Sequence, residues 1–573
     1  MNDELKEKKK NIKHSNSLAL FLVGSLIMTS LWGCASKKNS DSKDATSTDI
    51  VEEVSDEDGS TKDAASQNEA SSDKDNNENA EATSSNNYKD NHLTKDDINI
   101  SETYTDEGDG THAITADGES ADYSDVAVYK TGEADGDEAD FYGENAAIFA
   151  TNGATLTLSG IYVETDGTHA NGVFSYGEGT TVDISDSVIE TSGNCSGGLM
   201  TTGGGTTNAS NLTITTSGNS SAAIRSDRGG GTVNIDGGFY KTSGTGSPVI
   251  YSTADITVSN AYLESTASQG VVVEGKNSVT LKDCILDADN NTKNSDKSDT
   301  YQAVMIYQSM SGDADSGTSS FKMSGGSLTN ANGDIFFVNN TACTIDLEDV
   351  DITNIDSDGV FLRAEAAGWG NSGSNGGKVT MTAVNQNIDG DMIVDEVSAL
   401  NLYLTKESVF SGAINTDGTA GEVYVELDET STWTLTEDSY ITSLTCVAGC
   451  INLNGHILYV NGEVYTDGTD STGEAIEIVS ENTSSGSGDM GMPDGEAPDG
   501  KGGSGDRGKP DGNVQDGENS SIVPGGSTDG SDGSGSLGSS GGTGGNGGTP
   551  PEKPSGENGG PGGNGGTLPE KPN

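Results

Sequence analysis

The residues best suited to acid–base chemistry are two arginines and an aspartate that lie close together, Arg225, Asp227 and Arg228. A polysaccharide lyase needs a basic side chain to remove a proton from the sugar, next to carboxylates that hold Ca²⁺. These three residues are therefore the candidate catalytic group if the chain is an enzyme. The alternative, which we favour, is that they are exposed turn charges paired with nearby aspartates, with no catalytic role.

Two histidines, His112 and His169, occupy the same place in two copies of the pentapeptide Asp-Gly-Thr-His-Ala, at 109–113 and 166–170. This turn resembles one found in calcium-containing β-helix modules that bind cellulose and pectin. The resemblance implies carbohydrate binding, with His112 and His169 as ligand-binding residues. The alternative is an Asp-Gly turn in which the histidine caps a strand.

An acidic loop follows the first histidine, and its candidate metal ligands are Glu133, Asp135, Asp137 and Asp140. Ca²⁺ takes carboxylate oxygens from exposed loops as ligands, so it is the cofactor we consider. The spacing is not that of an EF-hand, because Ala139 stands where an oxygen ligand is required. Solvation of the surface is the other explanation for these charges.

The composition favours one elongated domain with flexible tails over several globules. Hydrophobic residues make up 31% of the 573 residues and aromatic residues 5%. Acidic residues number 91 against 29 basic ones, which gives a formal charge of -62. A field of this sign repels phosphate backbones, so we expect no nucleic-acid partner.

The N-terminus carries a secretion signal. Several lysines precede an apolar run from Leu18 to Trp32, and the run ends at Cys34. Leu31-Trp32-Gly33-Cys34 resembles the lipobox of bacterial lipoproteins. The resemblance implies that residues 1–33 are removed and that Cys34 carries a lipid, which would anchor the protein to the membrane on its outer side at the cell surface. An uncleaved membrane anchor is the alternative.

Low-complexity segments flank the central part of the chain. Residues 34–95 are predicted to form a disordered acidic tether, because Ser, Asp, Lys, Asn and Glu cannot bury enough apolar surface. Residues 481–573 are a disordered tail rich in Gly, Ser, Asp and Pro. The folded domain is therefore expected at 96–480.

An internal repeat of about 25 residues fills this domain, and each unit holds three short alternating strands separated by Gly, Asn, Asp or Ser. The sequence therefore predicts an all-β, single-stranded, right-handed parallel β-helix of about a dozen coils. Two interior ladders are expected, each a row of apolar side chains that stack from one coil to the next. One contains Leu156, Val182, Val233, Ile256, Val279, Phe321 and Ile345, and the other Val163, Ile189, Ile214, Tyr240, Leu263, Leu286, Leu328 and Ile352.

The stacked units resemble the pectin-lyase-like β-helix superfamily over about 350 residues, although the signature motifs of pectate lyases and polygalacturonases are absent. The stretch from Val423 through Trp433 to Cys446 resembles the closing coils of adhesin-type β-helix proteins. That resemblance implies a surface adhesin. Cys446 and Cys450 are near enough to pair, but buried free thiols are the interpretation we prefer.

Alternation places three aromatic residues, Tyr162, Phe239 and Tyr262, on the outer side of the third strand. Exposed aromatic rings on a flat sheet can stack on sugars or dock a partner. The leading hypothesis is a non-enzymatic adhesin or carbohydrate-binding module whose partner is a polysaccharide or a host or cell-surface ligand. The alternatives are a Ca²⁺-assisted polysaccharide lyase or glycoside hydrolase, and a structural spacer or matrix protein.

Overall fold

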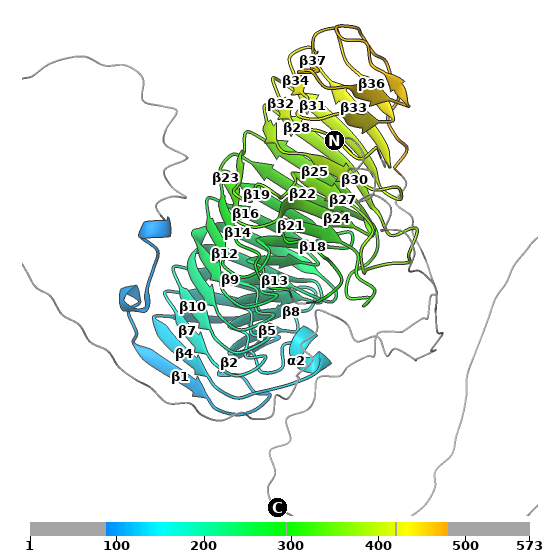
Figure 1. Cartoon of the computed structure of the whole chain (residues 1–573). Coiled ribbons are helices and arrows are strands. Elements are labelled where there is room, and N and C mark those ends of the chain that lie inside the picture. The colour runs from blue at the N-terminus through cyan, green and yellow to red at the C-terminus, as the bar shows by residue number, and fades with distance from the viewer. Residues whose placement is uncertain (1–87, 294, 419–420, 479–573) are drawn as a thin grey trace, which may run out of the picture. The chain divides into compact units, whose positions relative to one another are not determined.

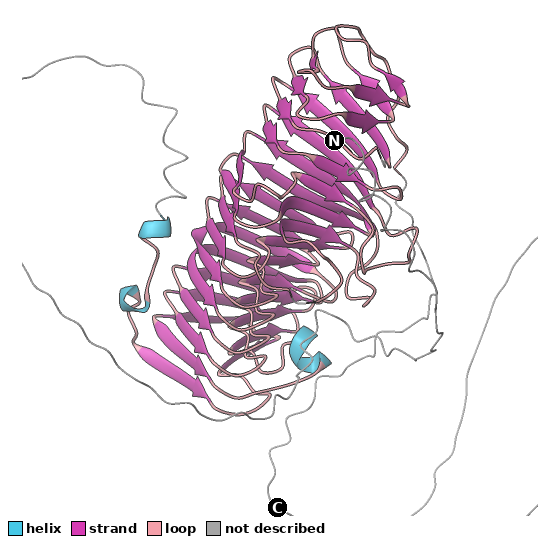
Figure 2. Cartoon of the chain, in the orientation of Figure 1, coloured by secondary structure: helices cyan, strands magenta, loops and turns pink. Residues whose placement is uncertain are grey.

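The computed structural model describes residues 88–293, 295–418 and 421–478. The chain divides into two compact units, Met1–Gly488 and Asp489–Asn573, and every described residue belongs to the first unit. The predicted signal, Cys34 and most of both tails lie outside the described residues. Strand makes up 48% of the structure and helix 3% (Figure 2).

The chain forms a parallel β-helix, as the repeat predicts, in which each coil supplies three strands to three stacked ladders (Figure 1). The first ladder is an 11-stranded sheet. Its strands are β2 (Ile114–Asp117), β5 (Ile148–Thr151), β8 (Val173–Tyr176), β11 (Leu199–Thr202), β13 (Ile224–Ser226), β15 (Ile250–Ser252), β18 (Val271–Glu274), β21 (Gln302–Tyr307), β24 (Asp334–Asn339), β27 (Leu362–Ala364) and β30 (Met392–Val394).

The second ladder runs the length of the domain, and its strands pair in parallel from one coil to the next. They are β3 (Ala121–Ser124), β6 (Thr155–Ser159), β9 (Thr181–Ser185), the first halves of β12 (Gly205–Thr216) and β14 (Gly231–Thr242), β16 (Asp255–Ser259), β19 (Ser278–Lys282), β22 (Thr318–Ser324), β25 (Thr341–Glu348), β28 (Gly377–Val384), β31 (Ala399–Thr405), β33 (Glu422–Leu427) and β36 (Ser443–Thr445).

The third ladder shares the long strands β12 and β14, whose second halves belong to it. Its other strands are β1 (Glu102–Asp106), β4 (Val126–Lys130), β7 (Tyr162–Thr165), β10 (Val188–Thr191), β17 (Tyr262–Ser265), β20 (Ile285–Ala288), β23 (Ser327–Asn330) and β26 (Asp351–Asn354). The last coils add a four-stranded sheet of β29 (Asn387–Asp389), β32 (Val409–Ser411), β34 (Thr432–Thr434) and β37 (Ile451–Asn452), and a three-stranded sheet of β35 (Ser439–Ile441), β38 (Leu458–Val460) and β39 (Glu463–Val464).

Helices are short in the described part of the chain. A 3-10 turn, η1 (Lys95–Asp97), precedes β1, and α2 (Asp137–Phe141) lies between β4 and β5. None of the helices described is long and apolar enough to cross a membrane.

The interior is packed by the two predicted ladders. Leu156 pairs with Val182, and the row continues to Ile345, with Thr207 as the member that the repeat pattern did not identify. The Val163 row is likewise in register and buried up to Leu328. Neighbouring coils thus bury a continuous apolar core that no single coil could form.

Glycines at one corner allow the coils to stack closely. Gly167, Gly193, Gly218 and Gly244, which we call the glycine stack, recur at the turn after the third strand. A Cβ on Gly218 would lie 1.8 Å from the carbonyl oxygen of Gly193, and one on Gly244 would lie 1.8 Å from that of Gly218. No other residue fits such a backbone approach, which explains the repeated glycine.

Trp433 is a large buried side chain in the C-terminal coils of the core. Its ring is buried and stacks on Phe410 with a centroid distance of 5.4 Å, and its Nε1–H donates to the carbonyl oxygen of Gly412 at 2.9 Å. Cys446 and Cys450 are buried free thiols here, as expected.

Candidate functional site

The three aromatic residues predicted for ligand binding do lie on the outer side of the third ladder, but another part of the chain covers them. Tyr162 and Tyr262 are each 1% exposed and Phe239 is 6% exposed. Residues 88–98 lie over these rings, although residues 88–95 belong by composition to the tether. The expectation of exposed rings was therefore wrong. The alternation of side chains along a strand predicts which side of the sheet a residue faces, but it does not predict whether another segment packs on that side.

The two histidines are structural residues of the turns. Nδ1 of His112 lies 2.8 Å from the carbonyl oxygen of Ala146, and its ring stacks on Phe149 with a centroid distance of 4.6 Å. His112 is partly buried, and this burial lowers its pKa. His169 is 1% exposed, so its imidazole is not presented to a ligand in the way that we predicted. The alternative, a histidine fixed in an Asp-Gly turn, describes both better.

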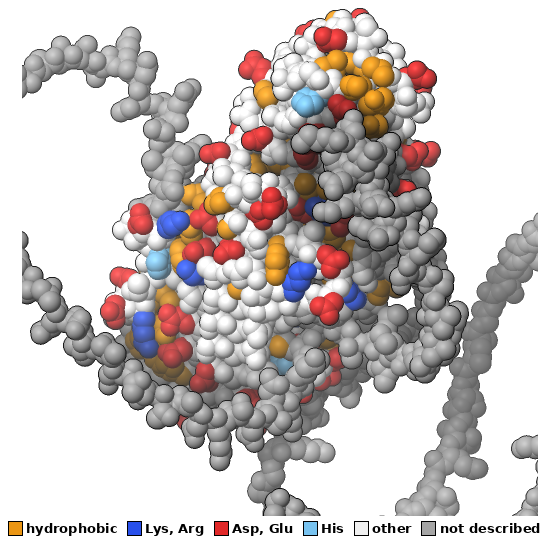
Figure 3. All heavy atoms as spheres, viewed as in Figure 1, with side chains coloured by type: hydrophobic (Ala, Val, Ile, Leu, Met, Phe, Trp, Pro, Cys, Tyr) orange, Lys and Arg blue, Asp and Glu red, His pale blue; other side chains and the backbone are white. Residues whose placement is uncertain are grey.

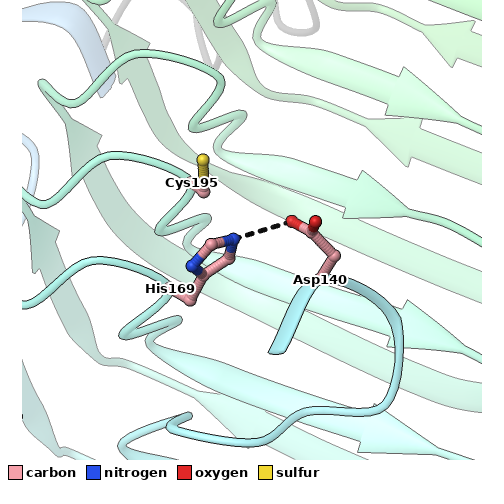
Figure 4. A group of neighbouring side chains, drawn as sticks. All are labelled: Asp140, His169 and Cys195. Atoms are coloured by element: carbon pink, nitrogen blue, oxygen red, sulfur yellow. Dashed lines mark hydrogen bonds and ion pairs between the residues drawn. The ribbon is translucent and has the colours of Figure 1, made fainter. Parts of the chain in front are cut away.

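Both ring nitrogens of His169 face oxygen acceptors. Nδ1 lies 2.8 Å from the carbonyl oxygen of Ala134, and Nε2 lies 2.9 Å from Oδ1 of Asp140 (Figure 4). Nδ1 must donate to the carbonyl, so the Nε2 contact is either an imidazolium–carboxylate pair or a neutral imidazole that accepts a proton from the carboxyl group. The contact fastens α2 to the β-helix.

The sulfur of Cys195 lies beside this pair, and the three ligand atoms are all within 4.8 Å of one another (Figure 4). Nε2 of His169 and Oδ1 of Asp140 are already paired with each other. Among the described residues, the group offers three ligand atoms, one fewer than the four of a structural zinc site.

The acidic loop does not form the predicted calcium cage. Asp140 binds His169, whereas Asp137 faces Arg228, whose Nη1 lies 3.0 Å from its carboxylate. Among the described residues, Glu133, Asp135 and Asp137 do not join Asp140 in a cluster of ligand atoms. Asp137 and Asp140 both lie in α2, but each carboxylate is engaged by a different basic residue.

The arginines are paired with aspartates, as we expected, but Arg225 and Asp227 are buried instead of exposed, and Arg228 is partly exposed. Nη2 of Arg225 lies 2.7 Å from Oδ2 of Asp227, and the two residues are 4% and 2% exposed. Nε of Arg228 donates to Asp313 at 2.6 Å, so this arginine joins α2 to the insertion before β22. Burial raises the pKa of Asp227 to about 7, the carboxylates of Asp313 and Glu274 add to it, and Arg225 opposes it.

A second buried carboxyl group, Glu274, lies near this pair. Its Oε2 accepts a hydrogen bond from Tyr307 at 2.8 Å and another from Tyr251. Burial raises its pKa, and hydrogen bonds from Ser309, Tyr251 and Tyr307 oppose that rise. The pattern of residue types suggested nothing at Glu274, since its environment is built by side chains from β15, β18 and β21.

One open feature of the described surface is a shallow groove of about 420 Å³ on the outer side of the second ladder. Strands β6, β9, β12, β14 and β16 supply its floor through side chains that occupy one register position: Thr157, Asp183, Asn208, Asn234 and Thr257. Nδ2 of Asn234 donates to Asn208 at 3.0 Å, and Nδ2 of Asn208 donates to Asp183 at 2.8 Å.

The sequence analysis did not identify this groove. The usable signal was that the outward residues at this register position, Thr157, Asp183, Asn208, Asn234 and Thr257, all carry hydrogen-bonding groups of similar size. The next outward row along the strands forms the second edge of the groove, and it consists of Ser185, Ser210, Asp236 and Ser259.

Acidic side chains are scattered over the viewed face of the protein, and basic ones are few (Figure 3). Several exposed hydrophobic side chains lie at the C-terminal end, among them Val447, Ile457 and Val464. No protein-family model, no curated protein and no solved structure matches this chain.

Proposed function

We propose that the protein is a non-enzymatic carbohydrate-binding module of a bacterial surface lipoprotein, and that it acts as an adhesin through the groove on the second ladder. The observation that carries this proposal is the row of amide, hydroxyl and carboxylate groups at one register position. Consecutive groups are about 4.8 Å apart, the spacing of neighbouring strands. Such a row offers a hydrogen-bonding group at each coil to a long hydroxylated chain.

The charge of the groove favours a neutral polysaccharide. Its outward side chains are mostly uncharged, with Asp183 and Asp236 as the acidic exceptions, and it contains no lysine or arginine. A ligand with many carboxylates or sulfates would meet no basic partner here, and the net charge of -62 would repel it. We therefore expect cellulose, xylan or mannan to bind better than pectate.

The surface location rests on the lipobox resemblance at Leu31–Cys34. A lipid on Cys34, followed by the residues up to 87, would place the groove away from the membrane surface. Metabolic labelling with a palmitate analogue tests this part, because a Cys34→Ala variant should lose the label and be released into the medium.

The binding itself is tested with insoluble polysaccharides and the mature chain, with and without Ca²⁺. Asn208→Ala combined with Asn234→Ala should reduce retention at least tenfold. Thr382→Ala is the matched control, since Thr382 lies in the same outward row but beyond the groove, and it should bind like the wild type. Equal retention of all three proteins would contradict the proposal for this groove.

A second candidate function is glycoside hydrolysis or lyase chemistry, which the raised pKa of Asp227 and the neighbouring Arg225 favour. Both side chains are buried beneath α2 and the insertion before β22, so this group does not reach a polymer in the structure. Release of reducing or unsaturated sugar that is lost in Asp227→Asn would establish the enzyme. A protein that neither binds nor cleaves any polysaccharide would instead be a spacer.

A further inference from the structure

Residues 88–98, which we call the strap, lie across the outer side of the third ladder and end just before β1 (Figure 1, blue, at the left of the ribbons). They contact the outer face of β17 and β14 near their beginning and that of β7 and β4 near their end. The strap therefore spans several coils. It runs from the later coils back to the first, opposite to the order of the coils along the chain.

The first contact is made by a lysine and a histidine. Nζ of Lys89 lies 4.7 Å from the ring centroid of Tyr262 and 3.2 Å from Oδ2 of Asp287. The ring of His92 stacks on Phe239 at a centroid distance of 4.2 Å, and Phe239 stacks in turn on Tyr262. A cation and a flat ring thus cover two aromatic side chains that would otherwise face water.

The second contact is made by Lys95. Its Nζ lies 4.2 Å from the ring centroid of Tyr162 and 5.2 Å from that of Tyr129, and it forms a 3.5 Å ion pair with Glu164. The hydroxyl oxygen of Tyr162 lies 2.8 Å from Oε2 of Glu164 and 2.7 Å from Oε2 of Glu190, and its single proton is donated to one of the two carboxylates. The site is therefore both aromatic and acidic. Aromatic rings next to carboxylates select cations.

The contacts of Lys89, His92 and Lys95 with the sheet are made by side chains. The backbone hydrogen bonds within it are local, from Asp97 to Thr94 and from Ile98 to Lys95. In the described residues, the first backbone bond to the β-helix comes from Ser101, which donates to Asp125. Residues 99–101 are exposed and can act as a hinge. A segment held in this way can leave without disrupting a ladder.

We infer that the outer face of the third ladder is a docking site for the strap of a second copy of this chain, and that two copies exchange straps. The contacts in an exchanged dimer are the same as those within one chain, so only the hinge geometry changes. A bare face would expose Tyr162, Phe239 and Tyr262, which favours occupation by one strap or another. In dilute solution each face binds the strap of its own chain in preference to the strap of a second copy, because the effective concentration of a tethered strap is about millimolar.

The test uses charge reversal in two full-length variants that cannot close on themselves. The strap variant carries Lys89→Glu and Lys95→Glu, and the face variant carries Glu164→Lys and Asp287→Lys. All four side chains are exposed or half-exposed, so both variants should keep the circular dichroism spectrum of the wild type. Each variant alone should be monomeric, because its strap is repelled by every face available.

Mixing the two variants should produce a one-to-one dimer, measured as a doubled mass by light scattering, since each strap then meets a face of opposite charge. The matched control carries all four substitutions in one chain, where the reversed strap fits the reversed face and the protein should stay monomeric. A mixture that remains monomeric while both variants are folded would overturn the inference.

A peptide measurement provides an independent result. A labelled synthetic peptide of residues 88–100 should bind the strap variant at least tenfold more tightly than the face variant, with an affinity that falls as salt is added. Equal binding of the peptide to both variants would also overturn the inference. Neither measurement involves carbohydrate, so it stands apart from the function proposed for the groove.

Discussion

The carboxylate of Asp227 accepts a 2.7 Å hydrogen bond from the guanidinium of Arg225, and both side chains are buried on the outer side of the first ladder. Arg225 remains charged at every accessible pH. Asp227 has two further carboxyl groups in its surroundings, Asp313 and Glu274, and only part of this negative charge is compensated.

The stability of the protein is predicted to fall as the pH rises toward neutrality. Burial, with the nearby carboxylates, raises the pKa of Asp227 from 3.8 to about 7. The folded state therefore binds this proton more tightly than the unfolded state does, and the contribution is complete below pH 3.8 and lost as the pH rises through about 7. The melting temperature should decrease between about pH 4 and pH 8.

Asp227→Asn isolates this contribution from the general repulsion among 91 acidic residues. The amide keeps the shape of the carboxyl group but does not titrate, so the difference in melting temperature between variant and wild type should grow with pH. If the two proteins show parallel pH profiles, Asp227 is ionised throughout and its pKa is not raised.

Gly218→Ala should destabilise the β-helix by about 3 kcal/mol, the upper end of the usual cost of overpacking. The added Cβ would lie 1.8 Å from the carbonyl oxygen of Gly193, and the two coils would have to separate. The neighbouring Ser217→Ala is the control, because Ser217 is exposed and should tolerate the change. Urea unfolding followed by circular dichroism measures both, and equal midpoints would show that the stack is not close-packed.

The sequence was sufficient for the fold because every coil repeats the same physical pattern. Val163, Ile189 and Ile214 could be aligned from alternation and turn residues alone, and the structure places them in one register. The glycine stack follows the same period. Such features depend on contacts between neighbouring units, which a period of about 25 residues encodes directly.

The candidate sites were not predictable in the same way, because they depend on segments outside the repeat. Alternation placed Tyr162 on the outer side of its strand, but the strap that covers it comes from a stretch with the composition of a disordered tether. Arg228 is bound to Asp137 and Asp313, which are 91 and 85 residues away in sequence. Contacts between residues so far apart in the sequence cannot be predicted from the local sequence pattern.

Arg228→Ala is predicted to loosen two loops without unfolding the β-helix. Its guanidinium carbon lies 3.8 Å from the ring centroid of Phe141, and it also binds Asp137 and Asp313. Removing it should speed amide hydrogen exchange in 136–142 and 309–315, while exchange in the strands stays unchanged. Lys276→Ala is the control, since it removes only an exposed ion pair to Asp315. Unchanged exchange in both loops would show that other contacts hold them.

A buried lysine lies at the start of the core. Lys130 is 0% exposed, and its Nζ lies 3.1 Å from Oδ2 of Asp106 and also donates to the carbonyl oxygen of Gly108. Asp106→Asn would leave this ammonium group without its carboxylate, at a cost of about 3–5 kcal/mol. Lys130→Met fills the same space without a charge and should cost less.

Thermal unfolding at neutral pH should therefore show the wild type as the most stable protein, Lys130→Met as less stable, and Asp106→Asn as the least stable. Combining Asp106→Asn with Lys130→Met should recover most of the stability lost in Asp106→Asn, because no buried charge is then unpaired. If the two single substitutions were simply additive, the ion pair would not be coupled. The charge of Lys130 would then be compensated by the carbonyl of Gly108 and not by Asp106.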